Sequence, residues 1–327
     1  MDPYEYLKIS RNPDGSITRH ASIPFSPANP DATPVLSKDV PLNPAHKTWL
    51  RIFLPTQSSP SPEKQLPVVF YFHGGGFILL SAGTTLFHDF CVKLSAELPA
   101  VVLSVEYRLA PEHRLPAAYD DAVDALLWAC AQALGPASAV GARADFSRCF
   151  LMGSSAGANI AYHAGLRAMA MDLNPLKIQG LILYQPFFGG KDRTESETRM
   201  AEDPVLALPV NDLMWELSLP EGADRDHEYC NPVVGKTGRE GATAVAGLPR
   251  CLVKGHTGDP LLDRQKLFLR MLERGGVEVV AWIEEGGCHG IDVHDAKQAE
   301  KLLSDIRGFA SLAAGAGAAA AAGAGEG

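Results

Sequence analysis

The sequence predicts an α/β fold in which a mostly parallel central sheet carries helices on both faces. Short, uninterrupted apolar runs, which are typical of buried strands, alternate with longer segments whose apolar residues recur every three or four positions. Chains with this alternation build a parallel sheet covered by helices. The chain has 327 residues and no Pro/Gly/Ser-rich linker divides it, so residues 1–312 are predicted to form a single domain.

The predicted elements follow from these two patterns. Strands are expected at 49–54, 66–72, 100–105, 149–152, 178–184, 251–253 and 277–283. Helices are expected at 87–97, 117–133, 156–171, 264–274 and 296–310. Near the N-terminus, the turn signal Asn12-Pro13-Asp14-Gly15 lies between two short segments, 6–9 and 16–19, and predicts an antiparallel start.

Two segments depart from the alternation. Residues 187–230 are rich in charge and contain the apolar patch Leu213-Met214-Trp215-Glu216-Leu217, which indicates an insertion that acts as a lid. Residues 313–327 are almost entirely Ala and Gly. Because such small side chains bury little area, this tail is predicted to be disordered.

Composition narrows the class of protein. The 29 basic and 38 acidic residues give a formal charge of −9 without long charge runs, which argues against a nucleic-acid partner. No apolar run reaches the roughly 18 residues of a membrane span, and the first residues lack a secretory signal pattern, so a cytoplasmic protein is expected. The six cysteines occur singly, without CxxC spacing, and are predicted to be buried thiols rather than disulfides or metal ligands.

The segment Gly153-Ser154-Ser155-Ala156-Gly157 is typical of a nucleophile elbow. A strand that turns into a helix through one residue strains that residue and projects its side chain above the sheet. The alternative is that the serines only cap the following helix. Since a predicted strand precedes the motif and a predicted helix follows it, the context favours Ser155 as a nucleophile.

A glycine run far upstream, His73-Gly74-Gly75-Gly76-Phe77, directly follows a predicted buried strand. Glycines leave backbone N–H groups unshielded, and the first residue of a helix has a free N–H. Gly75, Gly76 and Ala156 are therefore the expected donors of an oxyanion hole. A flexible turn or a phosphate loop is the alternative, but the GxGxxG and GxxxxGK patterns are absent. His73 is expected to hold the loop through ring hydrogen bonds.

A serine nucleophile needs a base and an orienting carboxylate. In the α/β-hydrolase order both follow the serine, the acid before the histidine, which favours Asp259 and His289. Each follows a predicted strand on a glycine-containing loop. His256 and His294 compete for the role of base, and Asp263 and Asp292 compete for the role of acid. His256 precedes the acid in the chain, and the other three fall at or inside the helices that follow.

These motifs, together with Tyr107-Arg108-Leu109-Ala110-Pro111-Glu112 and Asp259-Pro260, resemble those of plant carboxylesterases of the hormone-sensitive-lipase-like branch of α/β hydrolases, which also contains the gibberellin receptors. The resemblance covers nearly everything except the tail. It implies a cofactor-free carboxylic-ester hydrolase that acts on small esters with the triad Ser155, Asp259 and His289. It also implies a cap built from about 1–45 and 187–230. The chain departs from the family pattern at Ser154, often acidic, and at Ala158, often glycine.

Two other functions share these motifs. A hormone receptor is disfavoured because receptors of this branch replace the catalytic histidine, whereas His289 is present. A dehydratase that reuses the triad for elimination stays open, as does the oligomeric state. Several apolar residues indicate a substrate pocket, with ordinary core packing as the alternative for each: Phe77, Ile78, Phe187, Phe188, Leu213, Met214 and Trp215.

Overall fold

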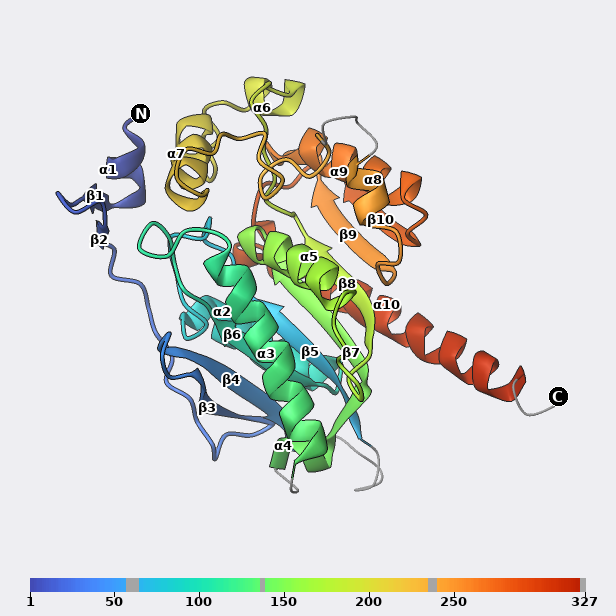
Figure 1. The fold of residues 1–327 in the computed structure, drawn as a ribbon. Coiled ribbons are helices and arrows are strands. Elements are labelled where there is room, and N and C mark those ends of the chain that lie inside the picture. The colour runs from blue at the N-terminus through green and yellow to red at the C-terminus, as the bar shows by residue number, and fades with distance from the viewer. Residues whose placement is uncertain (57–64, 136–138, 235–239, 324–327) are drawn as a thin grey trace.

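The computed structural model describes residues 1–327 except 57–64, 136–138, 235–239 and 324–327, and its centre is an eight-stranded sheet (Figure 1). The strand order is β10-β9-β8-β7-β5-β6-β4-β3. The strands are β3 (Val35–Asn43), β4 (Thr48–Pro55), β5 (Leu66–Phe72), β6 (Val101–Glu106), β7 (Ala144–Ser154), β8 (Ile178–Tyr184), β9 (Cys251–His256) and β10 (Val279–Glu284). All neighbours from β6 to β10 pair in parallel, and β4 and β3 extend the sheet antiparallel, which confirms the mostly parallel sheet.

Helices cover both faces of the sheet, as predicted. Helices α3 (Ala117–Leu134), α5 (Ala156–Ala168) and α9 (Leu262–Arg274) pack in one apolar core, and α2 (Thr85–Glu97) and α10 (Ala296–Gly323) pack in the other. Figure 1 shows α3 and α5 lying across one face of the sheet. Strand β5 supplies both cores because its side chains alternate, Phe70 and Phe72 to one and Val69 and Tyr71 to the other. This explains why its sequence is an unbroken apolar run.

A group of small elements lies beyond one end of the sheet (Figure 1). It comprises α1 (Pro3–Leu7), the antiparallel pair β1 (Ile9–Arg11) and β2 (Ile17–Arg19), α6 (Glu195–Arg199) and α7 (Leu208–Ser218). Helix α1 contacts α7, and the Tyr6 hydroxyl donates a hydrogen bond to the Pro204 carbonyl. The N-terminal segment and the insertion therefore meet in space although almost 200 residues separate them. Two short α-helices, α4 (Ala139–Arg143) and α8 (Glu240–Ala244), and the short 3-10 helix η1 (Ile291–Val293) complete the described elements.

Three segments differ from the predictions. Residues Val35–Asn43, inside the segment assigned to the cap, form the edge strand β3 of the main sheet. An edge strand pairs with a neighbour on one side only, so its other side can carry polar residues. The antiparallel pair around the predicted turn is present, but its first strand begins only at Ile9, because Tyr6 and Leu7 end helix α1, whose N-terminus the Asp2 side chain caps. Helix α10 continues to Gly323, since alanine has the highest helix propensity and the preceding turns are already packed. The last four residues of the predicted disordered tail lie outside the described residues.

Over the part of the chain that the structure describes, no helix is both long and apolar enough to cross a bilayer.

Candidate active site

Ser155 lies at the sharp turn between β7 and α5. Its backbone has φ 55° and ψ −119°, a conformation that residues other than glycine rarely adopt. Helix α5 also passes so close to the neighbouring strand β5 that a Cβ on Gly157 would overlap the Phe72 carbonyl. The Ser155 side chain makes no capping bond to α5, so the helix-cap alternative does not describe it. The turn instead holds the hydroxyl above the sheet, as expected for a nucleophile elbow.

The Ser155 hydroxyl lies beside His289. Its Oγ is 2.9 Å from His289 Nε2, and His289 Nδ1 is 3.0 Å from Asp259 Oδ2. Because a carboxylate only accepts hydrogen bonds, Nδ1 carries the proton and Nε2 is left with a lone pair facing the hydroxyl. The structure therefore brings the three predicted residues together in the order that proton abstraction requires.

Asp259 is fully buried, and the surrounding chain fixes the direction of its carboxylate. Oδ1 accepts from the Leu261 backbone N–H at 2.9 Å, and Oδ2 accepts from Gln265 Nε2 at 2.9 Å as well as from His289. These donors compensate for the loss of solvation that an isolated buried carboxylate would suffer. The acid is thus held in one orientation from two sides.

The competing candidates lie elsewhere. His256 is buried under the Gly287 backbone with neither ring nitrogen bonded in the described structure, and His294 is exposed. Asp263 accepts from the Ser196 backbone N–H. Asp292 is near His289 without bonding to it in the described structure. Among the described contacts, Asp259 alone accepts from His289.

The environment of His289 raises the pKa of its imidazole above 6.5. Burial alone would lower that pKa, but the Asp259 carboxylate outweighs burial, and Asp203 and Asp292 add to the effect. The negative charges favour the imidazolium that forms when the base takes the serine proton. At mildly acidic pH, a smaller fraction of His289 is therefore in the neutral form that can accept a proton than for an ordinary histidine.

Gln185 was not predicted from the sequence, yet it holds the loop that carries His289. Its Nε2 donates to the Cys288 carbonyl at 2.9 Å, and its Oε1 accepts from the Gly290 backbone N–H at 2.7 Å. The two bonds grip the residues on either side of the histidine. A polar residue directly after the buried strand β8 is the signal that would have identified it.

The glycine loop after β5 has the open backbone expected of an oxyanion hole. Gly75 and Gly76 have φ of 114° and 60°, and a Cβ on Gly75 would overlap the Leu79 carbonyl. His73 holds the loop as expected, since its Nδ1 lies 2.7 Å from the Gly74 carbonyl oxygen and 3.2 Å from the Tyr107 hydroxyl. Within the described residues, the N–H groups of Gly75, Gly76 and Ala156 have no protein acceptor. They are therefore available to an oxyanion.

A cavity of about 290 Å³ opens onto Ser155, His289 and the three glycines. Its remaining wall is mostly apolar or aromatic and is contributed by Leu7, Tyr71, Leu79, Leu80, Leu86, Phe87, Phe90, Ser154, Tyr184, Gln185, Val205, Leu206, Met214, Gly290, Asp292 and Val293. Leu7 comes from the N-terminal segment, and Leu206 and Met214 come from the insertion. Both segments therefore line the cavity, as a lid would.

Of the residues predicted to form the substrate pocket, Met214 lines this cavity. The others are absent from the lining and are buried in the core behind it: Phe77, Ile78, Phe187, Phe188, Leu213 and Trp215. Phe187 and Trp215 stack with ring centroids 4.7 Å apart. Successive helical residues point about 100° apart, so Met214 faces the cavity while its neighbours on α7 face the core. These six residues therefore pack in the core, which was the alternative to the substrate pocket.

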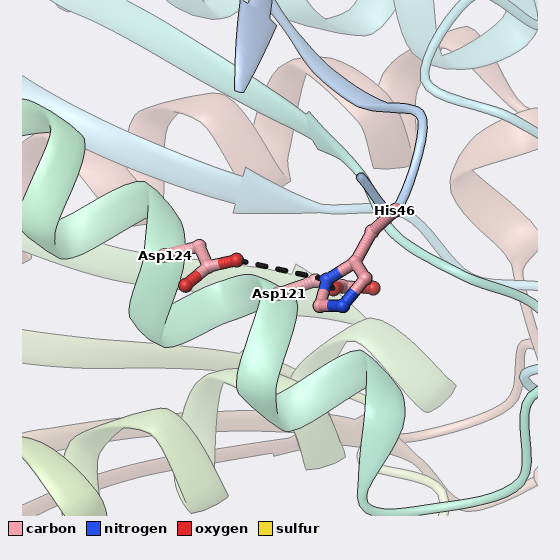
Figure 2. Close-up of side chains that lie close together, drawn as sticks. All are labelled: His46, Asp121 and Asp124. Carbon is pink, nitrogen blue, oxygen red and sulfur yellow. Dashed lines mark ion pairs between the residues drawn. The ribbon is translucent and has the colours of Figure 1, made fainter. Parts of the chain in front are cut away.

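One group of side chains has the composition of a metal site. Figure 2 shows His46 beside Asp121 and Asp124 of α3, with ligand atoms within 4.8 Å of one another. Asp121 is already engaged by Arg108, whose Nε and backbone N–H donate to it at 2.9 and 2.8 Å. Asn43 Nδ2 donates to Asp124 at 2.8 Å. A neighbouring guanidinium repels a cation, so the cluster serves to attach the β3–β4 turn to α3.

Comparison with known proteins places the chain in a family. A family model described as the alpha/beta hydrolase fold matches residues 69–293. The chain is 50% identical to 3-O-acetylpapaveroxine carboxylesterase CXE1 of Papaver somniferum, over 94% of this chain and 97% of that protein. It is 48% identical to carboxylesterase 20 of Arabidopsis thaliana, over 94% and 96% of the two chains.

Solved structures give the same result. An esterase of Pyrobaculum calidifontis superposes with a TM-score of 0.70 at 26% identity, covering 86% of this chain and 85% of that one. A bacterial heroin esterase superposes with a TM-score of 0.69 at 27% identity, covering 84% of each chain. The shared fold and the high identity to the plant enzymes lead to one conclusion: the chain belongs to the α/β-hydrolase superfamily and is a plant carboxylesterase of the hormone-sensitive-lipase-like branch.

Proposed function

We propose that this carboxylesterase cleaves small esters through an acyl-enzyme on Ser155, with His289 as the general base and Asp259 as the residue that orients it. The observation that carries the proposal is the pair of contacts at His289, 2.9 Å to Ser155 Oγ and 3.0 Å to Asp259 Oδ2. A weak alcohol nucleophile becomes effective when an adjacent base removes its proton during attack.

The reaction has two steps. Ser155 Oγ attacks the ester carbonyl while its proton moves to His289 Nε2, and the same proton then passes to the leaving alcohol. Water, deprotonated by His289, next attacks the acyl carbonyl, and the acyl–oxygen bond to Ser155 breaks as His289 returns the proton to Oγ, which releases the acid. The backbone N–H groups of Gly75, Gly76 and Ala156 stabilise the oxyanion in both steps.

The cavity supports small substrates with compact apolar groups. Its volume of about 290 Å³ lies at the lower end of ligand sites, and most of its lining is apolar. The relative that is 50% identical is named for an O-acetyl ester, which agrees with a short acyl group. The segments around α1 and from α6 to α7 act as the cap over this cavity. A cytoplasmic location completes the proposal, since the six cysteines are free, as in a reducing compartment.

The test compares wild type with Ser155→Ala on p-nitrophenyl esters of increasing acyl length. We expect turnover to fall by roughly 10³-fold or more, with a residue of activity from the oxyanion donors and binding. Ser154→Ala is the matched control, because Ser154 is the neighbouring serine and does not contact His289 in the described structure. Near-full activity of Ser155→Ala would remove this serine from the mechanism. Hydrolysis products, an acid and an alcohol, would exclude the dehydratase alternative.

A further inference from the structure

Asp292 is an ionisable group in the cavity that the proposed reaction does not use. It belongs to the short helix η1 (Ile291–Val293), three residues after His289. Its side chain lines the same cavity as Ser155 and His289. The carboxylate interacts with the hydroxyl of Tyr184 at the end of β8. His289 does not need it as a partner, because Asp259 already accepts from Nδ1.

The charge of the cavity is one-sided. Among the described residues that line it there is no lysine and no arginine, and Asp292 is the only carboxylate. Asp203 and Asp259 lie close enough to act on His289 as well, so the carboxylates near the histidine all favour a positive charge there. The lining also holds aromatic rings, whose faces attract cations: Tyr71, Phe87, Phe90 and Tyr184.

The carboxylate of Asp292 has capacity for a further partner. A carboxylate offers about four acceptor sites, and the Tyr184 hydroxyl that interacts with it could occupy only one of them. Burial raises the pKa of Asp292, because its ionised form is poorly solvated there. A cation placed beside such a carboxylate replaces part of the missing solvation, whereas a second anion would be repelled.

We propose that Asp292 makes the cavity selective for esters that carry a cationic amine, either protonated or quaternary, and that it selects against esters with a second carboxylate. The inference rests on the proposed function, since that function places the ester in this cavity beside Ser155. Asp292 acts here as a specificity-determining residue. It takes no part in the bond-breaking steps.

The test measures kcat/KM for isosteric esters that end in trimethylammonium, tert-butyl or carboxylate groups. One series carries the end group on the acyl side, and a second carries it on the alcohol side. At pH 8 and low salt, wild type is expected to prefer the cationic ester over the tert-butyl ester in at least one series. Asp292→Asn should lower that ratio by about tenfold, a value between those for a charge pair in bulk water and in a partly buried site.

Taking the ratio of two isosteres on the same variant cancels any general change in activity. Asp31→Asn is the control, since Asp31 is exposed and outside the cavity, and it should keep the wild-type ratio. If Asp292→Asn keeps the wild-type ratio in both series while the tert-butyl ester is cleaved through Ser155, the inference fails and the proposed function stands. If no ester is cleaved through Ser155, both fail.

Discussion

The replacement Asp259→Asn tests the proposed roles of the triad with the smallest possible change in shape. The Leu261 N–H lies 2.9 Å from Oδ1, so the amide oxygen of asparagine must stay at this position to accept it. The new NH2 group then faces His289 Nδ1. It donates to that nitrogen, which forces the imidazole proton onto Nε2, where it points at the Ser155 hydroxyl instead of receiving its proton.

The same geometry predicts that the variant folds. In the wild type, Gln265 Nε2 donates to Asp259 Oδ2, while Gln265 Oε1 has no partner among the described residues. Rotating this amide by half a turn lets Oε1 accept from the new NH2 without losing a bond. We therefore expect a melting temperature within a few degrees of wild type and a fall in kcat of roughly 10⁴-fold, the size seen where such a carboxylate is replaced by an amide.

The assay is steady-state hydrolysis of p-nitrophenyl butyrate, with a thermal melt to show that the variant is folded. Asp203→Asn is the matched control. It also removes a carboxylate that acts on His289, but Asp203 bonds to the Val205 and Leu206 N–H groups and not to the histidine. It should keep kcat within about tenfold of wild type. A folded Asp259→Asn enzyme with kcat inside that same range would refute the reasoning.

Two further predictions concern pH and packing. Because the base must be neutral and the pKa of His289 is raised, kcat/KM for a neutral ester should decline on acidification with a midpoint above 6.5. The variant Asp203→Asn removes a nearby negative charge and should move that midpoint down. A wild-type midpoint below 6 would contradict the environment assigned to His289. Gly157→Ala should destabilise the protein by about 3 kcal/mol or more, since its methyl group meets the Phe72 carbonyl backbone. The control Gly308→Ala, on α10 with open space around it, should leave the melting temperature unchanged or slightly higher, and equal melting of the two variants would argue against the close approach of β5 and α5.

Much of the candidate site could be predicted from the sequence because its parts are local. The strained turn at Ser155 and the glycine loop are each encoded within five consecutive residues, and the small residues among them are the signal. Gln185 escaped this reasoning for the opposite reason, and Asp292 was considered only as a competing acid and not as part of the cavity wall. Gln185 directly follows a strand and Asp292 lies in the short helix η1, and the relation of each to His289 or to the cavity exists only once the strands are side by side.

The sequence by itself determined the fold class, since buried strands and amphipathic helices each have a period that a short window contains. It also determined which residue types carry the chemistry. The tertiary structure alone decided which of the apolar residues face the cavity, because a one-residue step on α7 separates Met214 from the buried Trp215. It also decided that β3 joins the sheet and that a hydroxyl and an imidazole 134 residues apart come within 2.9 Å, since contacts at that separation depend on how all the intervening elements pack.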